Sequence, residues 1–109
     1  MDKKKELKEK YKQMKSKMGI FVLRFNGSEK YFLETTQNLK GKMNSTKFQL
    51  QIGSHRNKEL QNEWNLHGEN NCIIQVLEKL QYDKDETKTD YSEELAILKI
   101  IWEEKLKNI

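Results

Sequence analysis

The residues best suited to chemistry in this sequence are cations, three in its first half and one near its end. Lys42, His55 and Arg56 follow a hairpin-like pattern, and Lys99 comes much later. Such side chains neutralise phosphate groups, so their natural partner is a polyanion such as DNA or RNA. The sequence contains neither a glycine-rich phosphate loop nor a Ser/His/Asp arrangement, and its single cysteine, Cys72, has no second thiol to pair with. The pattern favours nucleic-acid binding by Lys42, His55, Arg56 and Lys99.

The charge distribution supports the same class of partner. Residues 1–18 and residues 19–58 each carry a net charge of +5, whereas residues 59–109 carry −6. Positive charge therefore gathers on the half that holds the hairpin and the first three cations. A field of this kind attracts polyanions and speeds their association.

The elements that must position these residues belong to one domain, since 109 residues are enough for a single core. A basic amphipathic helix is predicted over residues 2–17, within an N-terminal segment 1–18 that precedes a domain over 19–109. Asn26-Gly27 lies between two short apolar runs and predicts a tight hairpin over about 19–25 and 30–34. A helix capped by Thr35 or Thr36 is then expected to run to Ile52, with a break between Gly41 and Thr46.

The second half predicts two more helices and one more strand. Asn57 is expected to cap a helix that stops at Gly68, and residues 71–77 read as a strand in the centre of the sheet. Residues 82–90 read as a solvent loop, and Asp90 with Glu93 marks the start of a last helix. The predicted order is α-β-β-α-α-β-α, an α+β class with a three-stranded, mainly antiparallel sheet flanked by helices.

The two short motifs resemble those of the GIY-YIG nuclease family. Gly19-Ile20-Phe21 and Phe32-Leu33-Glu34 are separated by ten residues, and the resemblance to bacterial members continues through about residue 80 with a matching helix at 91–106. The resemblance implies a site built from a tyrosine in each motif, an arginine, a histidine and a metal-binding glutamate. Those positions correspond here to Phe21, Phe32, Lys42, His55 and Lys99.

These substitutions predict that hydrolysis is lost. Phe21 and Phe32 lack the hydroxyl, Lys42 lacks the two-pronged geometry of arginine, and Lys99 reverses the charge where a carboxylate would bind the metal. We therefore expect a nuclease-like domain without catalytic activity, which acts as a nucleic-acid-binding or regulatory module. No cofactor is expected. Glu34 is expected to pair with Lys42 or Lys99.

Two alternatives remain open. A metal-dependent DNA endonuclease would need a relocated carboxylate, from Glu34, Glu94 or Glu103, and Mg²⁺ or Mn²⁺. A protein-interaction module would instead pair the basic and acidic halves of two subunits. No apolar run of about 18 residues or signal-like segment is seen, so we expect a cytoplasmic protein without a membrane partner.

Overall fold

A computed structural model describes residues 16–107. Its sheet has three strands, β1 (Met18–Phe25), β2 (Tyr31–Thr36) and β3 (Cys72–Leu80), in the order β2-β1-β3 with both pairings antiparallel. Three helices accompany it, α2 (Leu39–Gln51), α3 (Lys58–His67) and α4 (Ser92–Lys107), and a short 3-10 turn, η1 (Glu69–Asn71), precedes β3. The predicted α+β class and antiparallel sheet are confirmed.

The central strand is β1, and its sequence explains why. Seven of its eight residues are buried, and only Arg24 is exposed. The continuous apolar run Gly19–Leu23 suits a strand with both faces covered. The prediction that residues 71–77 form the central strand is wrong, because β3 alternates between half-buried and exposed positions along most of its length and pairs with β1 alone. One side of β2 and one side of β3 are therefore sheet edges.

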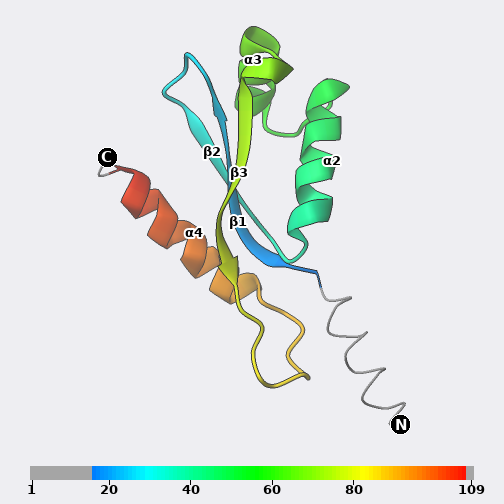
Figure 1. Ribbon diagram of the computed structural model, residues 1–109, viewed down its shortest axis with the longest axis vertical. Helices are drawn as coiled ribbons and strands as arrows, with labels where there is room; N and C mark the ends of the chain where they lie inside the picture. Colours follow the sequence, from blue (N-terminus) through cyan, green and yellow to red (C-terminus); the bar gives the residue numbers. More distant parts are fainter. Residues whose placement is uncertain (1–15, 108–109) are drawn as a thin grey trace.

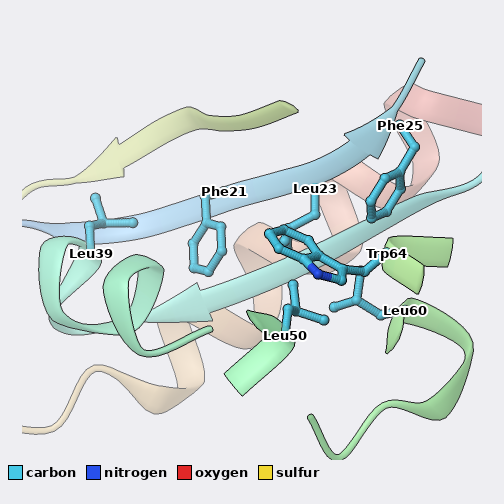
Figure 2. Close-up of a cluster of buried hydrophobic side chains, with 7 residues drawn as sticks. All are labelled: Phe21, Leu23, Phe25, Leu39, Leu50, Leu60 and Trp64. Atoms are coloured by element: carbon cyan, nitrogen blue, oxygen red, sulfur yellow. The ribbon is translucent and has the colours of Figure 1, made fainter. Parts of the chain in front are cut away.

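Helices α2 and α3 lie on one side of the sheet and α4 lies on the other (Figure 1), and each face carries a separate core. On one face, Phe21, Leu23 and Phe25 of β1 pack against α2 and α3, and Figure 2 shows these side chains among Leu39, Leu50, Leu60 and Trp64. On the other face, Met18 and Ile20 pack against Tyr91 and against Leu95 and Leu98 of α4. The β1–β3 register shifts between Ile20 and Phe21, where β3 carries one extra residue, Leu77, between Val76 and Glu78.

The start of α2 differs from the prediction. Thr35 and Thr36 belong to β2, and the cap is Asn38, whose side-chain oxygen accepts from the Gly41 backbone N–H at 3.1 Å. The expected break between Gly41 and Thr46 is absent from the continuous helix Leu39–Gln51. Gly41 falls in the first turn, where a glycine weakens a helix less than in its interior.

The other elements agree with the sequence more closely. Asn57 caps α3 by accepting from the Leu60 N–H at 3.2 Å, and Gly68 ends it with φ of 84°. The hairpin turn is confirmed at Asn26-Gly27, although only Gly27 has positive φ. Residues 2–15 of the predicted first helix lie outside the described residues. Its predicted end at residue 17 is wrong, because residues 16 and 17 are not helical and Met18 already pairs with Leu80 in β1.

Gly19 is needed for the close approach of β1 to β3. A Cβ atom there would lie 2.1 Å from the carbonyl oxygen of Glu78. No helix within residues 16–107 is long and apolar enough to cross a membrane.

Candidate nucleic-acid interface

A surface pocket of about 390 Å³ lies beside β2, between the start of α3 and the last helix. Four consecutive residues of β2, from Tyr31 to Glu34, form one wall. Because β2 pairs only with β1, this wall is the outer part of the sheet. The remaining lining residues come from the α3 cap and from α4: Asn57, Lys99, Glu103 and Lys107.

The regular spacing of α4 explains its contribution. Lys99, Glu103 and Lys107 are four residues apart, so they lie on one face of the helix. Next to this face, Leu95 and Leu98 of α4 are buried in the core. The indole N–H of Trp102 also donates to Glu78 of β3 at 3.0 Å. These contacts fix the rotation of α4 about its own axis, so that Lys99, Glu103 and Lys107 face the pocket.

Gln37 attaches the end of β2 to the segment before α4. Its side-chain amide donates to the Thr89 carbonyl at 2.9 Å, and its side-chain oxygen accepts from the Tyr91 N–H at 3.3 Å. The two walls of the pocket are thereby held to each other near the start of α4.

The pocket is lined by equal numbers of negative and positive side chains, and most of them form no ion pair among residues 16–107. Glu34 and Glu103 supply two carboxylates, and Lys99 and Lys107 supply two ammonium groups. Within the described part of the chain, Lys107 contacts Glu104 at 3.8 Å, and the other three have no ion pair within 4.0 Å. The expected pairing of Glu34 with Lys42 or Lys99 is therefore not observed.

The two phenylalanines occupy different surroundings. Phe21 is fully buried among the residues of α2 and α3, as Figure 2 shows, and does not line the pocket. Phe32 is half-buried, packs against the same cluster and lines the pocket. Of the two motif positions, only Phe32 therefore meets Lys99 at this site.

The other predicted cations lie outside the pocket lining. Lys42 is exposed in the first turn of α2, whereas His55 and Arg56 follow its last turn. The nine residue steps from Lys42 to Gln51 span roughly 14 Å of helix. The His55 N–H donates to Gln61 at 3.1 Å, and its ring Nδ1 accepts from the Asn57 N–H at 3.0 Å, so the histidine is tied into the loop before α3. Arg56 and Lys58 flank Asn57, a pocket residue.

Sequence reasoning did not assign Tyr31, Asn57 or Lys107 to a site. The i, i+4, i+8 spacing of Lys99, Glu103 and Lys107 was a usable signal. The position of Asn57 beside α4 had no local signal, because it depends on how the loop after α2 packs.

A three-stranded antiparallel sheet with α2 and α3 on one face and α4 on the other is the fold of the GIY-YIG nucleases. Among solved structures, the chain is similar to the catalytic domain of homing endonuclease I-TevI, with a TM-score of 0.65 and 21% identity over 83% of this chain and 88% of that one. It is equally similar to a mutant of the intron endonuclease I-TevI catalytic domain, with a TM-score of 0.64 and 21% identity over 84% of each chain. These likenesses confirm the predicted resemblance at the level of the fold. No family model and no curated protein matches the sequence at a significant level.

The residues present do not fit the divalent metal that the nuclease fold implies. Residues 16–107 contain no group of three or more His, Cys, Asp or Glu side chains placed to hold a metal ion. In the pocket, Glu34 and Glu103 share the lining with Lys99 and Lys107, whose charges repel a cation. Glu94, the third candidate carboxylate, contacts Lys88 at 2.7 Å instead.

Proposed function

We propose that this domain binds nucleic acid without cutting it, as a binding or regulatory module with a nuclease-like fold. The observation that carries the proposal is Lys99, which lines the same pocket as Phe32. An ammonium group and a ring without a hydroxyl retain contact with phosphate and bases, but supply neither a carboxylate ligand for a metal nor a phenol.

Exposed cations outside the pocket supply further attraction. Helix α2 contains Lys40, Lys42 and Lys47 and has no acidic residue. Of these three, only Lys47 has an ion pair in the described structure, with Glu69 at 3.6 Å. Arg56 and Lys58 are exposed at the start of α3 and are also without an ion pair there. Free exposed cations exchange counterions for phosphates, which drives sequence-independent binding.

The test is an electrophoretic mobility-shift titration with DNA and RNA, repeated with Mg²⁺ or Mn²⁺. We expect a complex at low salt that weakens steeply as salt rises, and intact nucleic acid after incubation with either metal. A domain that shifts neither DNA nor RNA at low salt would contradict the proposal. Cleavage that a chelator abolishes would contradict the inactive assignment.

A metal-dependent DNA endonuclease is the second candidate, because Glu34 and Glu103 both line the pocket. For this function, a bound Mg²⁺ or Mn²⁺ would have to be held by these two relocated carboxylates despite Lys99. Loss of cleavage in both Glu34→Gln and Glu103→Gln variants would support it, while activity that survives both would exclude it.

A protein-interaction module is the third candidate, and exposed apolar residues on α4 favour it. Ile97, Ile100 and Ile101 are 52%, 61% and 44% exposed and lie on the helix face opposite the core. A concentration-dependent mass in solution would support this candidate. Loss of that association at high salt would indicate that the basic and acidic halves pair between subunits.

A further inference from the structure

The mixed charge of the pocket beside β2 sets it apart from a site for phosphate alone. A phosphate site needs cations and donors, whereas Glu34 and Glu103 would repel an anion. Among residues 16–107, neither carboxylate has an ion pair within 4.0 Å, so their oxygens are available to accept hydrogen bonds from a ligand. The lining therefore suits a ligand that carries both N–H donors and negative charge.

Two aromatic residues and a side-chain amide complete the lining. Tyr31 is 36% exposed and Phe32 is half-buried, and both line the pocket. The Asn57 side-chain oxygen already accepts from the Leu60 N–H at 3.2 Å, so its NH₂ group is the part left for a ligand. Aromatic rings favour flat heterocycles, on which they stack.

The pocket volume of about 390 Å³ falls within the usual range of small-ligand sites, roughly 300–1,000 Å³. In a duplex, the faces of each base are covered by its stacked neighbours. A base can therefore contact an aromatic ring through its face only when it is unstacked.

We propose that this pocket binds a single unstacked nucleotide whose base carries an exocyclic amino group. The amino group donates to Glu34 or Glu103, the phosphate lies by Lys99 and Lys107, and the base contacts the exposed ring of Tyr31. Cytosine, whose amino group is a known partner of carboxylates, is the simplest such base. The inference rests on the proposed nucleic-acid binding. It adds the class of ligand that the pocket beside β2 binds.

The test is calorimetric titration of the full chain with cytidine monophosphate and uridine monophosphate, which differ by an amino group in place of a carbonyl oxygen. We expect the cytidine nucleotide to bind about tenfold more tightly. Glu34→Gln and Glu103→Gln should reduce that preference, and Lys99→Gln should weaken both nucleotides. Lys84→Gln, in the exposed loop before α4, is the matched control and should change neither. Equal binding of the two nucleotides, or binding unaffected by Lys99→Gln, would overturn the inference.

A parallel titration compares a single-stranded oligonucleotide ending in cytidine 5′-phosphate with a blunt duplex of the same sequence. Tighter, Lys99-dependent binding of the single strand places the nucleotide at a strand end. Duplex binding without binding of either nucleotide would overturn this inference and leave the proposed function standing. If the domain binds cytidine monophosphate but no oligonucleotide, the ligand is a free nucleotide. That result would contradict the proposed function and leave this inference standing.

Discussion

The side-chain amide of Gln61 donates a hydrogen bond to the backbone carbonyl of Leu50 at 3.0 Å. Gln61 is buried on α3, and Leu50 is buried near the end of α2. The same side chain accepts from the His55 N–H at 3.1 Å. One glutamine thus joins the two helices and fixes the loop that carries His55 and Arg56.

Gln61→Ala should therefore lower the free energy of unfolding by about 1–3 kcal/mol, because it leaves buried backbone groups without a partner. The measurement is urea denaturation followed by circular dichroism. Asn62→Ala is the matched control, since Asn62 is exposed on the same helix and should change stability by less than about 0.5 kcal/mol. Equal effects of the two substitutions would show that Gln61 does not join the helices.

Lys99→Glu should create metal affinity that we expect the natural chain to lack. It would place a third carboxylate in the pocket with Glu34 and Glu103, and remove the ammonium that repels a cation. We expect Mn²⁺ to stabilise the variant by about 2.7 kcal/mol at one hundred times its Kd, measured by thermal unfolding. Lys84→Glu makes the same charge change in the loop and should give no Mn²⁺ dependence. A response to Mn²⁺ as large in the natural chain as in the variant would show that Lys99 does not exclude the metal.

Lys40 and Lys42 should contribute to nucleic-acid affinity through charge alone. Both are exposed in the first turn of α2, and neither has an ion pair within residues 16–107. Replacing both with glutamine should reduce the slope of log K against log salt by about 2, equally for all sequences. Fluorescence anisotropy over a salt series measures that slope. Lys47→Gln, on the same helix but already paired with Glu69, should have a smaller effect.

The start of α4 should be sensitive to acid. The Asp90 carboxylate accepts from the Ser92 backbone N–H at 3.0 Å, and this hydrogen bond lowers the pKa of Asp90 below its ordinary value of 3.8. A lowered pKa means that the stabilisation is present above about pH 4 and is lost as the pH falls through the folded-state value. The Ser92 amide resonance should follow this titration by NMR. Asp90→Asn keeps an acceptor without a charge, so the Ser92 amide should no longer titrate there. Loss of the helix start at the same pH in the variant would assign the transition to another group.

The sequence was most informative where a local rule decided the structure. Asn26-Gly27, Asn57 and Gly68 carry their turn and cap chemistry within a few residues, and each appears where it was predicted. The central position of β1 was missed, because it depends on which strand receives two partners. The cap of α2 was also missed, since Thr36 precedes Asn38 and both are good capping residues.

The candidate site was only partly predictable. Phe32 and Lys99, which the family resemblance assigned to one site, both line the pocket, while Lys42 and His55 lie outside its lining. Spacing along the chain indicates which residues share a helix face. It does not indicate how far a helix end lies from the edge of a sheet.

The complete burial of Phe21 makes a tyrosine at this position unfavourable. Its hydroxyl would enter a cluster made of Leu39, Leu50 and Trp64, where an unsatisfied hydroxyl costs about 1–3 kcal/mol. Accommodating that hydroxyl would require α2 and α3 to repack, so the position resists the change of this single side chain.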